Sequence, residues 1–400
     1  MKLEFPKGFL WGAATSAHQV EGNNHNDWTE WELKNAPRLS SESGGKYSPE
    51  NYISGRACDH YKRFREDFDI AKSLGHNVHR FSIEWSRVEP EEGKWDEKEI
   101  EHYREVISAL RERGIEPFVT LYHWTLPIWV RDHGGWKNQK TIVDFARYAE
   151  KMTASLQGVK YYMILNEPLV YAKLSFSYGK WPPQHRGNIS YFRVTRNLIS
   201  AHKAAYSAIK KNDNSALVGI AHNMSYFRPH QNTLINRLLA RLGAWQKNFY
   251  FLNAIKNHTD FIGFNYYTQY IVNFGFAKEK TADLTDMGWG ISPEGIYHTL
   301  KDLKKYNKPV YITENGLADA KDALRKKFIR EHLKWAHKAI SEGVDLKGYF
   351  YWSLLDNFEW SDGFQPRFGL VEIDYKTMER NIRQSAYTYA TIAKENSLEV

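Results

Sequence analysis

The chain has 400 residues, of which 42% are hydrophobic and 26% are charged, and these proportions exclude a disordered or fibrous protein. Its 55 lysines and arginines outnumber its 47 aspartates and glutamates, which gives a formal net charge of +8. No apolar run approaches the roughly 18 residues of a membrane span, and the single cysteine, Cys58, excludes an intrachain disulfide or a cysteine-based metal cluster.

Eight short apolar runs alternate with longer amphipathic stretches along the chain. The expected strands are residues 10–16, 77–83, 116–123, 161–166, 217–223, 261–267, 310–315 and 348–354. Between them, the stretches 96–113 and 140–156 carry apolar residues at helical spacing, and Gly114 is suited to end the first of these helices. Alternating strands and helices predict parallel βαβ units and an α/β fold.

Polar and aromatic residues lie at or just beyond the end of each expected strand. They are His18 and Gln19; Arg80 with Glu84 and Trp85; His123 and Trp124; Asn166 and Glu167; His222 and Asn223; Asn265, Tyr266 and Tyr267; Glu314 and Asn315; and Trp352 with Asp356 and Asn357. A doubly wound sheet would also alternate strands and helices. Residues of this kind at so many strand ends favour a (β/α)8 TIM barrel, which builds its active site there. We therefore expect one catalytic barrel domain over residues 1–400, with all eight clusters facing one pocket.

Two of the strand-end residues are carboxylates in a setting suited to catalysis. Glu167 follows the fourth strand and precedes Pro168, and Glu314 ends the seventh strand before Gly316. Either residue alone is also explained by an ion pair at a strand end. A pair of carboxyl groups, one acting as acid and one as nucleophile, is what retaining glycoside hydrolysis requires.

These residues lie within motifs that resemble the family 1 glycoside hydrolases, the retaining β-glucosidase and β-galactosidase family. The resemblance covers nearly the whole chain. Its motifs are, in order, FPKGFLWGAATSAHQ at 5–19, ACDHY at 57–61, RFSIEWSR at 80–87, YHW at 122–124, NEP at 166–168, TENG at 313–316, YWSLLDNFEW at 351–360 and RFGL at 367–370. Single motifs such as NEP have little specificity, but all of them in this order are highly specific.

The resemblance implies a retaining, exo-acting β-D-glycosidase in which Glu167 is the general acid/base and Glu314 the nucleophile. Glu314 must stay ionised to attack the anomeric carbon, and Arg80 beside it would favour the charged form. A hydrogen bond to Glu314 is expected from Tyr267, with the adjacent Tyr266 as the alternative. Glu167 must hold a proton near neutral pH, and the charge of Glu314 would raise its pKa. The two carboxyl groups are expected about 5–5.5 Å apart.

The same resemblance implies a sugar pocket around these carboxylates. Asn166 is expected to bind the sugar 2-hydroxyl. The residues expected to bind the terminal sugar, or glycone, are Gln19, His123 and Glu359 as polar partners, Trp124, Trp352 and Trp360 as indole faces or N–H donors, and Phe368 near the 6-hydroxyl. On the side of the leaving group, or aglycone, Trp289 is expected as a platform, and Asn223 reaches the same region. Each of these residues, taken alone, also fits an ordinary core position.

The residues around Glu359 indicate the class of substrate. Glu359 and Asp362 would repel a phosphate, so we expect an unphosphorylated glycone, with β-glucosides as the main substrates and β-galactosides and β-fucosides as further candidates. Small β-glycosides or short oligosaccharides such as cellobiose are the expected partners. The segment 179–187 reads Trp181-Pro182-Pro183 where the family commonly has His-Ala-Pro, which leaves the aglycone preference open. No metal-binding spacing and no nucleotide motif occurs, so no metal and no cofactor is expected.

The positive charge of the chain suggests other classes of partner. The isoelectric point near 9.1 raises nucleic acid as a partner, but the densest cationic run, 325–330, resembles the solvated face of a helix. We therefore predict no nucleic-acid and no membrane partner, and a cytoplasmic location; the oligomeric state stays open. Two alternatives remain: a transglycosylase that uses the same residues, and a non-catalytic carbohydrate-binding barrel.

Overall fold

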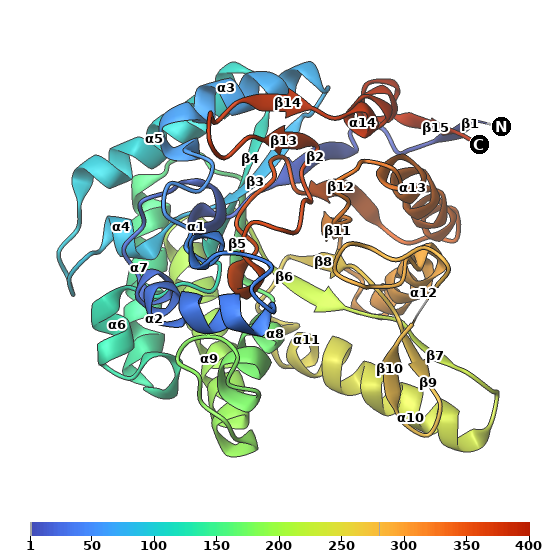
Figure 1. The fold of residues 1–400 in the computed structure, drawn as a ribbon, viewed down its shortest axis with the longest axis horizontal. Coiled ribbons are helices and arrows are strands. Elements are labelled where there is room, and N and C mark those ends of the chain that lie inside the picture. Colours follow the sequence, from blue (N-terminus) through green and yellow to red (C-terminus); the bar gives the residue numbers. More distant parts are fainter. Residues whose placement is uncertain (1, 280) are drawn as a thin grey trace.

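The computed structural model describes residues 2–279 and 281–400 (Figure 1). Eight parallel strands close into a barrel in the order β11-β12-β2-β3-β4-β5-β6-β8. These strands are β2 (Leu10–Ala14), β3 (Val78–Ser82), β4 (Glu116–Tyr122), β5 (Tyr161–Asn166), β6 (Leu217–Met224), β8 (Phe261–Tyr266), β11 (Val310–Asn315) and β12 (Leu346–Trp352). Each lies within two residues of a predicted run, so the (β/α)8 barrel is confirmed and the open doubly wound sheet is excluded.

Long helices surround the barrel (Figure 1). They are α3 (His60–Ser73), α5 (Glu97–Glu112), α7 (Lys140–Ser155), α9 (Asn188–Asn212), α12 (Pro293–Leu303), α13 (Arg325–Ser341) and α14 (Gln384–Glu395). The predicted helices at 96–113 and 140–156 correspond to α5 and α7. Asp96 begins α5 because its side chain accepts the backbone N–H groups of Lys98 and Glu99. None of the helices within the described residues is both long and apolar enough to cross a lipid bilayer.

The remaining elements fill the loops and edges. Two further helices, α2 (Asp27–Glu42) and α10 (Leu234–Ala244), match the barrel helices in length. The short helical elements are α1 (Ala17–Val20), η1 (Pro49–Tyr52), α4 (Trp85–Val88), α6 (Ile128–Asp132), η2 (Gly135–Lys137), α8 (Pro168–Ala172), η3 (Lys173–Ser177), η4 (Trp245–Phe249), α11 (Tyr250–Ile255), η5 (Lys304–Tyr306) and η6 (Trp360–Asp362). The small sheets pair β1 (Lys2–Glu4) with β15 (Ser397–Glu399), β13 (Val371–Ile373) with β14 (Arg380–Ile382), and β7 (Phe227–Pro229) with β9 (Tyr270–Val272) and β10 (Phe276–Lys278). The β1–β15 pair brings the two ends of the chain side by side (Figure 1).

An aromatic layer fills part of the barrel interior. The ring of Phe118 stacks on Tyr161, with centroids 4.7 Å apart. Three further rings meet Phe118 edge-on, those of Phe261, Tyr311 and Phe350. Because alternate residues of a strand point inward, Arg80 and Thr120 follow in the strands as inward-facing polar residues two positions after Val78 and Phe118. The interior therefore changes from aromatic to polar toward the carboxyl ends of the strands, where a barrel enzyme places its active site.

Candidate active site

The two predicted catalytic carboxylates lie at the ends of β5 and β11, which β6 and β8 separate in the barrel, and both are buried. Glu314 belongs to β11, and Glu167 lies between β5 and α8. The backbone of Glu167 is left-handed, with φ 43° and ψ 56°, a conformation that is costly for a residue with a side chain. Its N–H donates to the carbonyl of Ala221 at 2.8 Å, which ties this turn to β6. The strained turn is thus held by the barrel itself, and it fixes where the Glu167 side chain begins.

Each oxygen of Glu314 has its own hydrogen-bond donor. The buried guanidinium of Arg80 forms an ion pair with Oε1, and the Tyr267 hydroxyl donates to Oε2 at 2.6 Å. Arg80 is itself oriented by the Thr120 hydroxyl at 3.1 Å and the Thr313 carbonyl at 3.2 Å. The structure therefore places the predicted cation beside Glu314, and of the two tyrosines it is Tyr267 that contacts the carboxylate.

Glu167 occupies a different electrostatic environment. Burial, followed by the negative charge of Glu314, raises the pKa of Glu167 to about 7. Amide groups of Asn265 and Asn223 each donate to its Oε1 at 2.9 Å, and together with the Lys247 ammonium they act in the opposite direction. The sequence interpretation named only the charge of Glu314 as the cause; in the structure, burial is the larger one.

A chain of hydrogen bonds connects the two carboxylates. Arg80 donates to Oδ1 of Asn166 at 2.6 Å, and Asn265 donates to the same oxygen at 3.3 Å and to Glu167. The Thr313 hydroxyl donates to Oδ1 of Asn265 at 2.7 Å, which fixes the orientation of that amide. Asn265 was expected among the strand-end residues facing the pocket, but no catalytic or binding role was predicted for it. It pairs in register with Asn223 on one side and Glu314 on the other, so the alignment of polar residues across adjacent strands would have identified it.

Gln19 and Glu359 lie together on the predicted glycone side. The Gln19 amide donates to Oδ1 of Asn357 at 2.9 Å, to the carbonyl of Phe358 at 2.8 Å, and to Glu359 at 3.3 Å. Burial, followed by the charges of Asp362 and Glu314, raises the pKa of Glu359 well above its usual value. This region therefore presents a fully buried amide next to a carboxyl group that favours its neutral form.

His123 stands between two indole rings. Its ring is nearly parallel to those of Trp352 and Trp360, with both centroid distances at 6.0 Å. Burial, followed by the positive charge of Arg80, lowers the pKa of His123 well below its usual value, so the imidazole is neutral. Its Nε2 lies 3.1 Å from the amide nitrogen of Asn166, whose oxygen is already held by Arg80. Nε2 is therefore the acceptor, and Nδ1, which has no partner among the described residues, carries the hydrogen.

Trp124 contributes an aromatic face only. Its indole N–H donates to the carbonyl of Asn166 at 2.9 Å, so it is not available to a sugar. The ring packs against Trp360 and Trp181, with centroids 4.9 and 4.6 Å away. Trp181 comes from the segment that departs from the family motif, and its N–H donates to the Ser361 hydroxyl at 3.1 Å. The sequence identified this segment only as a departure and did not predict Trp181 as part of the aromatic wall.

Tyr267 lies between Glu314 and the two outer aromatic residues. Its ring lies 6.3 Å from that of Phe368 and 5.9 Å from that of Trp289, both nearly perpendicular. The Lys278 ammonium lies 4.2 Å from the centroid of the Trp289 ring. Phe368 is buried and Trp289 is half-buried. The structure therefore brings both residues to the Glu314 side of the site, whereas Asn223 contacts Glu167.

The expectation that all eight strand-end clusters face one pocket is wrong for several of their members. Tyr266 donates its hydroxyl to the Ser292 carbonyl at 2.8 Å, Trp85 stacks on Tyr148 of α7, and His222 contacts the Lys247 carbonyl. Asp356 instead forms ion pairs with arginines of the C-terminal segment. Successive residues of a strand point to opposite sides, so adjacent members of one cluster are divided between the barrel interior and the helical layer.

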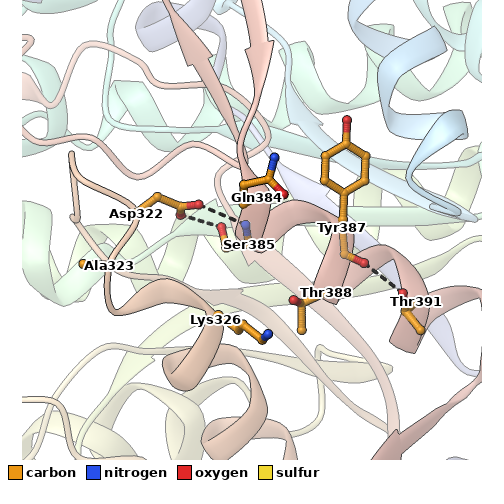
Figure 2. Close-up of a pocket in the computed structure, with 8 residues that line it drawn as sticks. All are labelled: Asp322, Ala323, Lys326, Gln384, Ser385, Tyr387, Thr388 and Thr391. Atoms are coloured by element: carbon orange, nitrogen blue, oxygen red, sulfur yellow. Dashed lines mark hydrogen bonds between the residues drawn. The ribbon is translucent and has the colours of Figure 1, made fainter.

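A second pocket on the surface offers no comparable pair of catalytic groups. A surface pocket lies between the starts of α13 and α14, and Figure 2 shows Asp322 in it facing Ser385. The Asp322 carboxylate accepts the backbone N–H of Ser385 at 2.9 Å and its hydroxyl at 2.6 Å, and it also pairs with Arg325. The carboxylate of Asp322 is thus already partnered, and the pocket contains none of the predicted site residues. Across residues 2–279 and 281–400, no group of three or more histidine, cysteine or acidic residues is arranged to hold a metal ion.

Known proteins resemble the chain over nearly its whole length. The model of glycosyl hydrolase family 1 matches residues 1–253 and 251–398. Beta-glucosidase A of Thermotoga maritima is 37% identical, with 99% of both chains covered, and a beta-galactosidase of Sulfolobus acidocaldarius is 32% identical, with 99% of this chain and 96% of that one covered. The solved structure of a beta-glycosidase from Pyrococcus horikoshii shares 40% identity at a TM-score of 0.91, with 100% of this chain and 97% of that chain covered. The chain belongs to glycosyl hydrolase family 1.

Proposed function

We propose that this family member is a retaining exo-β-D-glycosidase in which Glu314 is the nucleophile and Glu167 the general acid/base. The observation that carries this assignment is the contrast between the two buried carboxyl groups. Glu314 is bound by a guanidinium and a phenol, whereas Glu167 has a pKa of about 7. Such a divided pair can supply one anion and one proton at neutral pH. The names of the relatives, beta-glucosidase and beta-galactosidase, support the same activity.

In the first step, the Glu314 carboxylate attacks the anomeric carbon while Glu167 gives its proton to the glycosidic oxygen. The bond between that oxygen and the anomeric carbon breaks, the aglycone leaves as an alcohol, and a glycosyl ester forms on Glu314. Arg80 and Tyr267 hold the carboxylate in place before the attack. The pre-positioned nucleophile reduces the entropy that must be lost at the transition state.

In the second step, Glu167 changes role because its surroundings change. Ester formation removes the negative charge of Glu314, which is one of the causes that raise the pKa of Glu167. The pKa of Glu167 then falls, and its carboxylate takes a proton from the attacking water. The water oxygen bonds to the anomeric carbon and the ester bond to Glu314 breaks. The sugar is released with its original configuration, and Glu167 is protonated again.

The surrounding polar groups are suited to a neutral sugar. The Nδ1–H of the neutral His123, the Gln19 amide and the Glu359 carboxyl group supply donors and acceptors for hydroxyls, and Asn166 is assigned to the 2-hydroxyl. The rings of Trp352, Trp360 and Trp124 offer apolar faces, with Phe368 beside them. We assign β-glucosides as the main substrates, with β-galactosides and β-fucosides as further candidates. Trp289 and Asn223 are assigned to the aglycone side, and cellobiose is the simplest natural substrate of this class.

The same proposal covers organisation and location. We treat residues 1–400 as one catalytic domain, because β2 and β12, from opposite ends of the chain, are paired neighbours in the barrel. We assign the activity to the cytoplasm. Support comes from the single cysteine, Cys58, because a chain with one cysteine does not depend on the oxidising environment that an intrachain disulfide requires.

The experiment that tests this function is the release of nitrophenol from aryl β-glycosides, with Glu314→Gly assayed beside the wild type. The panel holds the glucoside, galactoside, fucoside, mannoside and 6-phosphoglucoside. We expect hydrolysis by the wild type, a loss of about four orders of magnitude in the variant, and partial rescue by azide with an α-glycosyl azide as product. Binding of sugars without hydrolysis would instead favour the carbohydrate-binding barrel, and transfer to added alcohols in place of water would favour the transglycosylase.

A further inference from the structure

Helix α10 carries an apolar stripe on its outer side. The helix lies along the lower right edge of the molecule, outside the barrel (Figure 1). Its inner residues, Ala240 and Gly243 among them, pack on a small apolar cluster beneath β7 and β9. The outer stripe, called the α10 stripe below, consists of Leu234 (64% exposed), Ile235 (53%), Leu238 (53%), Leu242 (54%) and Trp245 (50%). A helix that is apolar on both faces is expected to be covered on both.

Further exposed apolar residues lie on α9, which α11 connects to the end of the α10 stripe. The Trp245 ring packs edge-on against Tyr250 at 5.6 Å, and α11, which begins at Tyr250, contacts α9. At the start of α9, Ile189 is 88% exposed and Phe192 is 58% exposed. The exposed side chains thus belong to neighbouring elements of the same region and are not scattered singly over the molecule.

This region is almost free of negative charge. Residues 168–259 contain thirteen lysines and arginines but one acidic residue, Asp213, whereas the rest of the chain has forty-two cationic and forty-six acidic residues. On α10, Arg237 and Arg241 are exposed, and within the described residues neither forms an ion pair. Arg193 and Arg196 are exposed in the same way on α9. No short cationic run marks this stretch in the sequence, because its positive charge comes from the lack of carboxylates over residues 168–259.

We propose that the α10 stripe docks this protein on the surface of an anionic lipid bilayer. Exposed leucines and isoleucines beside unpaired arginines are what an interfacial helix needs, since the apolar side chains enter the acyl boundary and the cations meet the headgroups. Trp245 at one end of the stripe suits the interfacial zone. The prediction of no membrane partner rested on the lack of a spanning run, and a peripheral helix needs none.

Two other occupants fit the charge and apolarity less well. A symmetric pair of chains would place Arg237 and Arg241 against the same residues of the second copy, with no carboxylate nearby to compensate. A nucleic acid would neutralise the arginines but leave Leu238, Leu242 and their neighbours in water. A bilayer with anionic headgroups satisfies both features at once.

Docking in this orientation brings the aglycone side of the site close to the bilayer. Lys247 follows the stripe directly in η4 and interacts electrostatically with Glu167. In the adjoining hairpin, Lys278 pairs in register with Tyr270 and covers the Trp289 ring. The basic region thus extends from the apolar stripe to the predicted aglycone platform.

Vesicle flotation tests the proposal with the full chain. Vesicles of phosphatidylcholine alone are compared with vesicles in which about one-third of the lipid is phosphatidylglycerol, at low and at high salt. We expect the wild type to float with the anionic vesicles at low salt, to float poorly with neutral ones, and to be partly released by salt. If the protein stays in solution with both compositions, the proposal is overturned.

Variants separate the apolar from the charged contribution. Two double variants should each bind anionic vesicles more weakly than the wild type. In the first, Leu238→Ser is combined with Leu242→Ser. In the second, Arg237→Gln is combined with Arg241→Gln, and the loss of two cations should lower vesicle binding by about thirty-fold. The matched control is the double variant Leu33→Ser with Val143→Ser. These two aliphatic residues lie on α2 and α7, and their exposed fractions are similar to those of the stripe residues. Hydrolysis of a soluble aryl glucoside and the thermal unfolding temperature verify that each variant is folded. If the stripe variants float as well as the wild type, the α10 stripe does not bind the bilayer and the proposal is overturned. If the wild type is an oligomer that these variants convert to a monomer, the stripe binds a second copy of the chain and not a bilayer.

Discussion

The Tyr267 hydroxyl donates a 2.6 Å hydrogen bond to Oε2 of Glu314, while Arg80 occupies the opposite oxygen of the same carboxylate. Burial, followed by the charges of Glu314 and Glu167, raises the pKa of Tyr267 well above its usual value, so the phenol remains a donor at every pH at which the protein is expected to work. The carboxylate therefore has two fixed partners of different kinds. Arg80 balances the charge of the carboxylate, and Tyr267 fixes its orientation.

Removing the Tyr267 hydroxyl should slow catalysis without unfolding the protein. For Tyr267→Phe we expect kcat/KM to fall by about 10- to 100-fold, because a hydrogen bond to a charged group is worth roughly 1.5–3 kcal/mol. Steady-state kinetics on an aryl β-glucoside measure the loss. Tyr266→Phe is the matched control, since the Tyr266 hydroxyl binds the Ser292 carbonyl and no catalytic group. An equal loss in both variants would show that the effect arises from packing.

Lys247 should control the alkaline limb of the pH–rate profile. Glu167 must be protonated to act as an acid, so kcat/KM falls as the pH rises through its pKa of about 7. The positive charge of Lys247 lowers that pKa, and its removal in Lys247→Gln should move the limb to higher pH. Lys247→Arg keeps the charge and should leave the limb in place. A downward movement in Lys247→Gln would contradict the assignment of Glu167 as the group that titrates.

Asn223 and Asn265 should differ in their effects although both donate to the same oxygen of Glu167. Each bond stabilises the ionised form, so Asn223→Ala and Asn265→Ala should both raise the pKa of Glu167 and shift the alkaline limb upward. Asn265 also donates to Asn166, which in turn is held by Arg80. We therefore expect kcat to fall further in Asn265→Ala than in Asn223→Ala. Full pH profiles of kcat and KM for both variants separate the two effects, and equal kcat values would argue against a positioning role for Asn265.

The sequence predicted the barrel well because every strand is a short apolar run with helices between. It also indicated that Glu167, Glu314 and Arg80 share one site, because each lies in a motif that can be recognised along the chain, and the structure brings them together. It predicted no role for Asn265, since the alignment of Asn223, Asn265 and Glu314 arises from the register between separate strands. Trp181 was missed for a related reason: its partners, Trp124 and Trp360, come from two other loops.

The α10 stripe shows a second limit of sequence interpretation. The pattern in α10 is apolar at nearly every turn, which is compatible with a helix buried between two layers. Only the structure shows that Ala240 and Gly243 face the protein while Leu238 and Leu242 face outward. Exposure depends on which elements lie next to a helix, and that information is not contained in its periodicity.

Stability should depend on pH through the buried ion pair of Asp67 and Arg380, which includes neither of the proposed catalytic carboxylates. Asp67 of α3 accepts hydrogen bonds from His60 at 2.7 Å and from Arg380 of β14 at 2.8 Å. Burial acts to raise the pKa of Asp67, but the bonds and charges of His60 and Arg380 outweigh burial and hold it below its usual value. A carboxylate with a lowered folded-state pKa stabilises the fold above its unfolded pKa of about 4, and this contribution is lost as the pH falls through the folded-state value.

Asp67→Asn should therefore destabilise the protein by about 3–5 kcal/mol near neutral pH, because Arg380 is left buried without its counter-charge. The difference from the wild type should shrink as the pH falls below about 4, because Asp67 of the unfolded wild-type chain takes up a proton there, while the folded carboxylate does so only at lower pH. Thermal unfolding followed over this pH range measures both effects. Asp345→Asn provides the control, since Asp345 pairs with Lys347 at the exposed surface, where removal of one partner costs little. A deficit in Asp67→Asn that stayed constant down to about pH 3 would mean that lost packing, and not the lost charge, causes the instability.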